Sequence, residues 1–309
     1  MPQQITAVVS SQKRRKIRLS PGERAFYITA YAIIALLVLL VLYPLIYVLS
    51  ASFSSPVAVT TGKVVLFPVD FSLEGYRAVF SYPDVWLSYR NTIFYTVTGT
   101  ALNVAMTMIC AYPLARRGLP HKGFFMFLFS FTMMFGGSMI PGYLLMRDLK
   151  LLNTVWALII PGAMSVYQMI VARTFIQSTI PEELLEATQV DGCSDFRFFF
   201  QFVLPLSKAV IAVITMQYAI GHWNDYFNAF LYLSKKELYP LQIVLRRILV
   251  MSEIAAGDVD DPDLATALMG MADLLKYSLI VVATAPILCV YPFIQKYFVQ
   301  GIMVGSLKG

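Results

Sequence analysis

One acidic side chain interrupts a long apolar stretch in the second half of the chain. Asp225 is flanked by apolar segments, and an unpaired acid buried in a membrane-length segment is costly, so such acids are functional candidates. Polar and aromatic side chains lie close to it in sequence: Tyr218, His222, Trp223, Asn224 and Asn228. At helical spacing, positions 218, 222 and 225 share one side, and positions 224 and 228 share an adjacent one.

These side chains combine aromatic faces with hydrogen-bonding groups, which is the chemistry that a sugar needs from its binding site. The alternative is a belt of aromatic residues at the outer water interface, with Asp225 solvated. Both interpretations stay open on the residues alone. Gly136, Gly137, Tyr143 and Tyr167 are weaker candidates, because glycine in a span is more often a packing contact or a bend.

The residues argue against several other kinds of chemistry. His121 and His222 are the only histidines and lack metal-ligand spacing, so no metal site is expected. Three widely spaced cysteines, Cys110, Cys193 and Cys289, are expected to be buried thiols. The chain has no Gly-x4-Gly-Lys-Ser/Thr phosphate loop, so neither ATP hydrolysis nor a cofactor is expected on it. A membrane enzyme would need a catalytic cluster, and none is apparent.

A short, bounded helix is predicted between residues 179 and 192. Thr179 and Glu182 have the spacing of a capping box, Pro181 suits a first helical turn, and Gly192 provides a left-handed stop. A second helix start is expected at Ser194 or Asp195. The residues predicted on the apolar side are Leu184, Leu185, Ala187 and Val190. A docking helix and an ordinary amphipathic connector both fit this pattern.

The elements that must position these residues are membrane helices. Of 309 residues, 58% are hydrophobic and 14% charged, whereas soluble domains have about 25% charged residues. A span needs roughly 20 apolar residues, and windows of that kind predict six spans: 26–49, 91–115, 123–146, 151–172, 205–233 and 277–295. The first is too long for the core of a signal peptide and is expected to stay as an anchor.

The distribution of basic residues predicts the orientation. A basic run precedes the first span: Lys13, Arg14, Arg15, Lys16, Arg18 and Arg24. Beside a long apolar stretch, such a run fixes membrane orientation rather than binding nucleic acid. Both termini and residues 178–205 are therefore expected in the cytoplasm. The segment 234–276 is expected outside as a solvated loop containing Glu253, Asp258, Asp260, Asp261 and Asp263.

The bounded helix contains a motif that resembles a known family. Glu186, Ala187 and Thr188, then Gly192, then Leu204 and Pro205 resemble the EAA signature of ABC importer permeases. That signature reads Glu-Ala-Ala, three residues, Gly, nine residues, Ile-x-Leu-Pro. The spacing matches throughout, with Thr188 in place of the second Ala and Phe202 in place of Ile.

The resemblance covers nearly the whole chain. Residues 135–137 with Pro141, and residues 222–227, 239–242 and 300–309, are similar to maltose-type sugar permeases. Within these, the subgroup for complex oligosaccharides is the most similar.

The resemblance implies an all-α, polytopic membrane protein with six transmembrane helices. Residues 1–25 would be a basic cytoplasmic terminus, residues 26–300 the permease domain with its coupling segment at 178–205, and residues 301–309 a cytoplasmic tail. The coupling residues would be Glu186, Ala187, Thr188, Asp191, Gly192, Leu204 and Pro205.

The resemblance also implies partners and a location. The partners would be a second permease subunit, an ABC ATPase dimer that binds ATP and Mg, an extracellular or periplasmic solute-binding protein, and a sugar or oligosaccharide. The location would be the bilayer of a bacterial inner membrane. The main alternative is a self-sufficient carrier or channel driven by an ion gradient, which would need a relay of ionisable residues within its spans.

Overall fold

The computed structural model describes the backbone of residues 20–257 and 262–306, and in these ranges the regular structure is helical without strands. The chain divides into two units at Tyr47 and Val48, and each is described by itself. The first consists mainly of α1 (Pro21–Ser52). The basic residues 13–18 lie outside the described residues.

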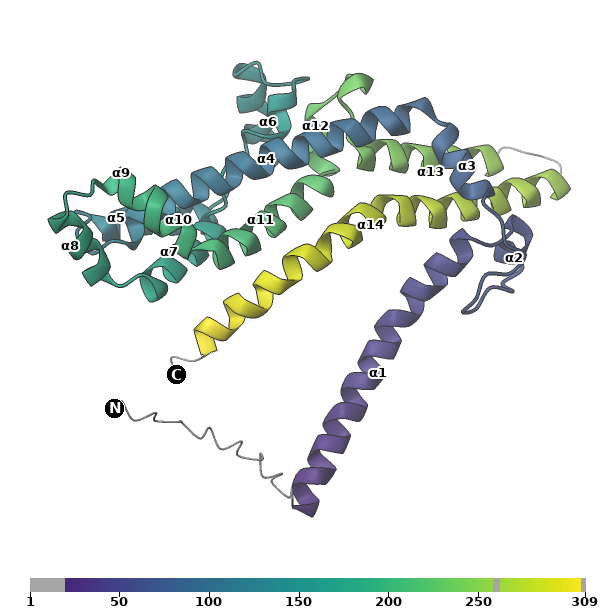
Figure 1. The fold of residues 1–309 in the computed structure, drawn as a ribbon. Coiled ribbons are helices and arrows are strands. Elements are labelled where there is room, and N and C mark those ends of the chain that lie inside the picture. The colour runs from purple at the N-terminus through teal and green to yellow at the C-terminus, as the bar shows by residue number, and fades with distance from the viewer. Residues whose placement is uncertain (1–19, 258–261, 307–309) are drawn as a thin grey trace, which may run out of the picture. The chain divides into compact units, whose positions relative to one another are not determined.

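The second unit contains the remaining elements (Figure 1). In chain order they are α2 (Pro56–Thr60), α3 (Glu74–Ser81), α4 (Pro83–Ala115), α5 (Lys122–Met134), α6 (Met139–Asp148), a 3-10 turn (Val155–Leu158), α7 (Val166–Thr179), α8 (Glu182–Val190), α9 (Asp195–Phe198), a π-helical turn (Phe199–Val203), α10 (Leu204–Leu206), α11 (Lys208–Trp223), α12 (Phe227–Tyr232), a second 3-10 turn (Lys236–Leu238), α13 (Leu241–Gly257) and α14 (Pro262–Ser306).

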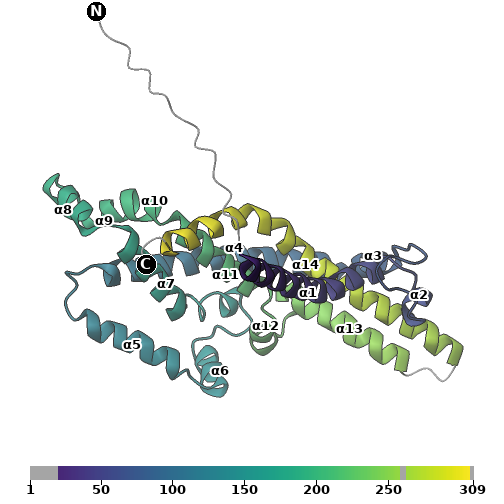
Figure 2. The ribbon, with the colours of Figure 1, turned by 90° about the horizontal axis from the view of Figure 1, so that it is seen from below.

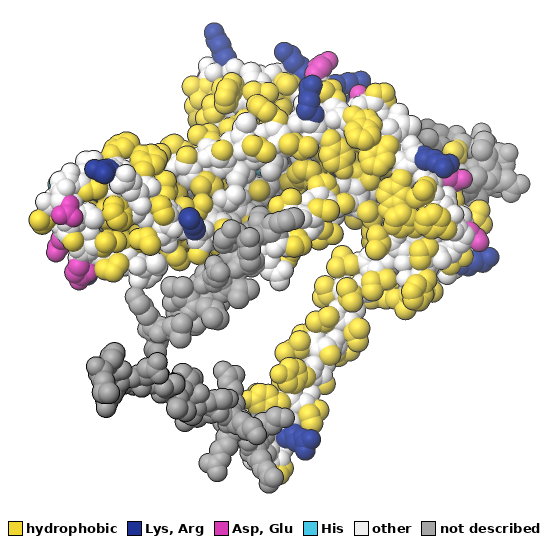
Figure 3. Space-filling model, viewed as in Figure 1, with side chains coloured by type: hydrophobic (Ala, Val, Ile, Leu, Met, Phe, Trp, Pro, Cys, Tyr) yellow, Lys and Arg dark blue, Asp and Glu magenta, His cyan; other side chains and the backbone are white. Residues whose placement is uncertain are grey.

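Helix α1 has the properties of a membrane span. It has 32 residues with a mean hydropathy of 2.9 in its most apolar window, and at about 1.5 Å per residue it exceeds the roughly 30 Å of a bilayer core. Its apolar side chains are exposed along its length, as Figure 3 shows. The span predicted at 26–49 is therefore confirmed as a helix of suitable length and composition.

Helix α11 lies between two long helices, α4 and α14, in the second unit. Helix α4 packs on α7 and α11, and α14 packs on α11 and α13, as both ribbon views show (Figures 1 and 2). Helix α4 and the part of α14 from 268 to 292 are long and apolar enough to cross a membrane. They contain the spans predicted at 91–115 and, in large part, at 277–295.

The span predicted at 123–146 is a bent helix pair. The span predicted at 205–233 consists of α11 and, after a break at 224–226, α12, and α11 belongs to a second bent pair that begins earlier, at Asp195. Helices α5 and α6 meet at 110°, and the segment from Asp195 to Leu206 meets α11 at 79°. The first bend lies at Gly136 and Gly137, which follow the C-cap of α5. The second follows Pro205, which removes a backbone donor and crowds the preceding turn. Within the described residues the chain has three candidate spans, or five if each bent pair counts as one.

The window predicted as a span at 151–172 is not one helix. A 3-10 turn and a non-helical stretch precede α7, whose 14 residues cover only about 21 Å. Such irregular backbone is tolerated at membrane depth where it is buried in protein or lines a polar cavity. The count of six spans remains a prediction.

The predicted outer loop at 234–276 is largely helical. Helix α13 and the first half of α14 pack together through apolar residues that include Leu241, Val244, Leu245 and Ile248, facing Leu275 and Leu279. Their spacing along α13 is that of one helical face, and this signal was available in the sequence. Residues 258–261, with three of the predicted acids, lie outside the described residues.

Candidate functional site

Helix α8 begins differently from its prediction. Its N-cap is Pro181 and it starts at Glu182, whereas Thr179 is the last residue of α7. The predicted capping box is therefore wrong, and the Thr179 hydroxyl is buried without a partner among the described residues. The start is stabilised instead by Glu182 and Glu183, whose charges suit the positive end of the helix dipole.

The predicted left-handed stop at Gly192 is confirmed. Gly192 has a φ of +75°, its N–H donates to the Gln189 carbonyl at 3.0 Å, and the Cys193 N–H donates to the Thr188 carbonyl at 2.9 Å. These two bonds form a Schellman motif, which satisfies carbonyls that a helix end would otherwise leave free. Ser194 then caps α9 by accepting from the Arg197 N–H at 3.3 Å, as predicted. The turn between α8 and α9 is thus held by backbone bonds at its start and a side-chain cap at its end.

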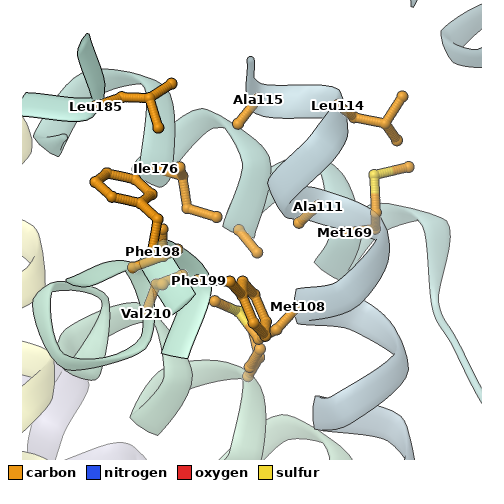
Figure 4. Close-up of a cluster of buried hydrophobic side chains, with 13 residues drawn as sticks. Met108, Ala111, Leu114, Ala115, Met169, Ile176, Leu185, Phe198, Phe199 and Val210 are labelled. Atoms are coloured by element: carbon orange, nitrogen blue, oxygen red, sulfur yellow. The ribbon is translucent and has the colours of Figure 1, made fainter. Parts of the chain in front are cut away.

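One side of α8 is anchored in an apolar cluster (Figure 4). Leu185 is 7% exposed and belongs to a cluster with residues from the ends of α4 and α7 and the start of the segment after α8, among them Ala111, Leu114, Ala115, Ile176, Phe198 and Phe199. Leu184 packs at its edge. Of the residues predicted on the apolar side, Leu185 is buried and Leu184 half-buried, whereas Ala187 and Val190 are exposed.

The end of α4 supports this cluster through backbone contacts. Three successive carbonyls there accept side-chain donors from other helices. Arg173 donates to Leu114 at 2.9 Å, Gln177 to Ala115 at 3.0 Å, and Lys122 to Arg116 at 3.0 Å. Positive groups at a helix C-terminus also suit its dipole. These bonds tie α7, which leads into α8, to the end of α4.

Two ion pairs link the loop after α4 to the predicted coupling segment. Arg117 contacts Glu182 at 2.9 Å, and Arg116 contacts Asp195 at 2.5 Å. Partial burial acts to lower the pKa of the Arg116 guanidinium, but the hydrogen bond to Asp195 and the neighbouring charges outweigh it and the pKa is raised. Because one side chain of each pair, Asp195 and Arg117, is largely exposed, each pair contributes under about 1 kcal/mol.

The motif residues divide between surface and core. Glu186, Ala187, Asp191 and Gly192 are exposed, and Thr188 is half-buried with its hydroxyl bonded to the Leu185 carbonyl at 2.8 Å. Leu204 is half-buried and Pro205 exposed. Acidic side chains gather at the end of the molecule formed by α8 (Figure 3). The motif therefore presents an open, acidic surface on a firmly held helix.

A separate polar cavity of about 400 Å³ lies where α11 ends. It is lined by four of the six predicted pathway residues, Tyr218, His222, Asp225 and Asn228, together with Asn103, Gln217 and the stretch from Ala157 to Gly162. Asp225 accepts from the Asn228 backbone at 3.2 Å and from its side-chain amide at 3.0 Å. The non-helical part of the predicted fourth span thus lines a cavity.

The family model described as "Binding-protein-dependent transport system inner membrane component" matches residues 106–304, which include the coupling motif and the four predicted cavity residues. The chain belongs to this family. It is a membrane permease component of a binding-protein-dependent transport system, a class that is not itself catalytic. The expected function is confirmed, and the self-sufficient carrier is not favoured.

Curated relatives and a solved structure agree with this permease assignment. The chain is 40% identical over 286 residues to the polygalacturonan/rhamnogalacturonan transport system permease protein YtcP of Bacillus subtilis strain 168, covering 93% of this chain and 99% of that one. It is 41% identical over 266 residues to protein LplC of the same strain, covering 86% and 89%. A crystal structure of a bacterial ABC transporter involved in the import of the acidic polysaccharide alginate contains a chain that is 35% identical, with a TM-score of 0.80 over 91% of this chain and 99% of that chain.

Two predicted pathway residues of the permease lie outside the cavity. The Trp223 side chain is 7% exposed, donates to the Ala283 carbonyl of α14 at 2.9 Å, and contacts Tyr89 edge-on at 6.3 Å between ring centres. Asn224 is exposed and donates to the Ile220 carbonyl of its own helix at 3.0 Å. In this structure Trp223 therefore packs α11 against α14 and does not face the space lined by Asp225.

Sequence reasoning missed a polar stripe on α4. Small or polar residues recur along this helix at intervals of four or seven positions, at Ser88, Thr92, Gly99, Asn103 and Thr107, and all five are buried. That spacing marks one helical face, and small or polar residues on one face of a span are typical of helix–helix contact in membranes. The signal was present in the sequence, but none of these five residues is charged, and the site was predicted around the charge of Asp225.

Proposed function

We propose that this permease forms half of a solute pathway with a second permease subunit and couples it to an ABC ATPase dimer through residues 178–205. The observation that supports this most is α8, which is fixed by the Schellman turn and by Leu185 while its other side stays open. Val190 on that side is 89% exposed. ATP and Mg would bind the ATPase, and this chain would need no cofactor of its own.

Replacing Gly192 with valine tests the coupling role. A β-branched residue at positive φ costs about 1–2 kcal/mol and disturbs the turn between α8 and α9. The variant should insert and assemble but show much weaker solute-stimulated ATPase activity. Gly118→Val is the control, because Gly118 lies in a nearby loop with open space around it and no positive φ. Wild-type stimulation in the Gly192 variant would contradict the coupling role.

The solute of this importer is proposed to be an oligosaccharide. The cavity at the end of α11 offers carboxylate, amide, imidazole and phenol groups, which match the hydroxyls of a sugar. Its size falls in the range of small-molecule sites, enough for part of a chain. The names of the relatives, with polygalacturonan, rhamnogalacturonan and alginate as cargo, favour fragments of polysaccharides.

Asp225→Asn tests the cavity as part of the pathway. Loss of a charge-assisted hydrogen bond costs about 1.5–3 kcal/mol, so uptake at low solute concentration should fall roughly 10- to 100-fold while assembly is unchanged. Asn224→Ala is the matched control, because Asn224 is the adjacent residue and its side chain bonds only to its own helix. Uptake should be measured in vesicles that contain the complete transporter. Equal uptake by both variants would remove Asp225 from the pathway.

The proposed location is a bacterial inner membrane with both termini and residues 178–205 in the cytoplasm. A solute-binding protein would then dock at the opposite end, beside α13. A cysteine at position 195 should resist an impermeant thiol reagent added outside, and one at 260 should react. The native cysteines must first be removed, because Cys289 is exposed. The reverse labelling pattern would overturn this orientation.

A further inference from the structure

His222, the histidine of the cavity, is held by Gly99 and Asn103, two residues that lie before the family-matched region. Gly99, Asn103 and Thr107 follow one another at intervals of four on α4, and they face Tyr218 and His222, also four apart, on α11. The Tyr218 and Thr107 hydroxyls are bonded at 2.7 Å, and His222 Nε2 lies 2.7 Å from Asn103 Oδ1. Asn103 is only 1% exposed, so this row is an internal contact of the helix pair.

The bonds of Asn103 determine which nitrogen of His222 carries the proton. The Asn103 Nδ2 group donates to the Gly162 carbonyl, and a carbonyl oxygen accepts but does not donate. The Asn103 Oδ1 atom must therefore be the one facing His222, and an amide oxygen also only accepts. It follows that His222 Nε2 donates and bears the proton. The Nδ1 atom of the neutral ring is then left with a lone pair as an acceptor.

Gly99 provides the space in which this ring lies. A Cβ atom at position 99 would overlap Nε2, Cε1 and Cδ2 of the His222 ring. The His222 ring is held in this place by its hydrogen bond to Asn103. Any side chain at position 99 would therefore displace the ring from Asn103. Thr107 and Tyr218 continue the row away from the ring, and Tyr218 also accepts from the Ser165 N–H at 3.0 Å. Contacts of α4 and α11 with the non-helical stretch before α7 thus frame the ring.

We propose that Asn103 and Gly99 are positioning residues that fix His222 as its Nε2–H tautomer and so present Nδ1 as an acceptor to a solute hydroxyl. This rests on the proposed function of the cavity. Asp225 provides acceptor oxygens in the same cavity, so His222 and Asp225 together form an acceptor pair. Such a pair selects solutes with neighbouring hydroxyl donors over solutes that only accept.

The tautomer can be measured directly, because the chain contains only two histidines. The complete transporter, reconstituted in lipid nanodiscs from this permease labelled with nitrogen-15 histidine and from unlabelled partner subunits, should give two sets of ring signals, and His121→Gln assigns them. In the wild type the His222 proton is expected on Nε2. Asn103→Leu, which keeps the side-chain shape but removes the acceptor, should give a mixture of tautomers. A wild-type proton on Nδ1, or an unchanged tautomer in Asn103→Leu, would overturn the proposal.

Transport provides the second measurement. With galacturonate oligomers as the probe, Gly99→Ala and Asn103→Leu should each raise the KM of uptake by about tenfold, the value of one hydrogen bond, with little change in the maximal rate. The control is Gly142→Ala, a helical glycine in α6 where an added Cβ meets only an ordinary contact with Tyr232. A wild-type KM in Gly99→Ala, or an equal rise in the control, would contradict the positioning role.

The two measurements separate this proposal from the proposed function. The tautomer is read without solute, so failure of the wild type to transport the probe counts against the proposed solute alone. In that event the tautomer of the wild type and of Asn103→Leu still decides whether Asn103 holds the ring.

Discussion

Replacing Leu185 with alanine should remove most of the solute-stimulated ATPase activity of the assembled transporter. Leu185 is the buried contact that joins α8 to the ends of α4 and α7. Truncating a buried leucine costs about 2–5 kcal/mol, depending on how far the site collapses. The permease should therefore lose thermal stability, and α8 should no longer move as one body with α7. Both changes can be followed by the Tm of the purified complex and by its ATPase rate with and without solute.

Val190→Ala is the matched control for this variant. The substitution also shortens an apolar side chain on α8, but Val190 is 89% exposed in the isolated chain. The Tm of the isolated permease should stay at the wild-type value, and only its association with the ATPase should weaken. An unchanged Tm in Leu185→Ala would show that the apolar cluster does not hold α8.

Trp223→Ala is expected to destabilise the permease by about 3–5 kcal/mol, the range for large aromatic side chains removed from a core. The indole fills the contact between α11 and α14, and its N–H bonds to the Ala283 carbonyl. Trp223→Phe should retain most of the packing and lose about 1 kcal/mol for the hydrogen bond. Uptake should fall in proportion to the amount of folded protein, with the KM unchanged. A raised KM in folded Trp223→Phe would instead place the indole in the pathway.

A proline explains why this contact is polar. Pro286 in α14 has no N–H, so the carbonyl of Val282, four residues earlier, lacks its helical donor. Tyr89 supplies one, with its hydroxyl 2.6 Å from that carbonyl, and Trp223 bonds to the next carbonyl. Neighbouring side chains commonly restore such bonds around prolines in membrane helices. Tyr89→Phe should therefore cost less in a Pro286→Ala background than in the wild type, which the Tm values of the four proteins would show.

The coupling segment was the most predictable part of the molecule. Its signals are local: the glycine gives the end of α8 correctly, and the proline and two acids give its start to within two residues. The error at Thr179 has the same origin, because the capping-box pattern was read without knowing that α7 continues through that residue. Which side of α8 faces inward depends on α4 and α7, and local spacing alone could not distinguish Leu185 from Val190.

The pathway residues were less predictable because they depend on contacts between distant segments. Tyr218, His222, Asp225 and Asn228 were found because they lie near one another in sequence. Asn103 was missed because it is uncharged and more than a hundred residues away. Trp223 was wrongly grouped with them for the same reason, because its neighbours in sequence face the cavity while its own side chain faces α14. Hydropathy predicted where most lipid-length segments lie, but not that residues 151–165 contain no α-helix.

The polar stripe on α4 also affects how the chain enters the membrane. The mean hydropathy of α4 is 1.4 in its most apolar window, against 2.9 for α1, so α1 partitions into lipid by itself with a much larger margin. Asn103 and Thr107 find their partners at Gly162 and on α11, and Thr92 bonds to the Leu241 N–H of α13, all of which the ribosome makes later. Until α11 has been synthesised, the Asn103 amide and the Thr107 hydroxyl of α4 are therefore expected to face lipid or the translocon. We therefore expect membrane insertion of this permease to be cooperative between helices, with α1 as the early anchor.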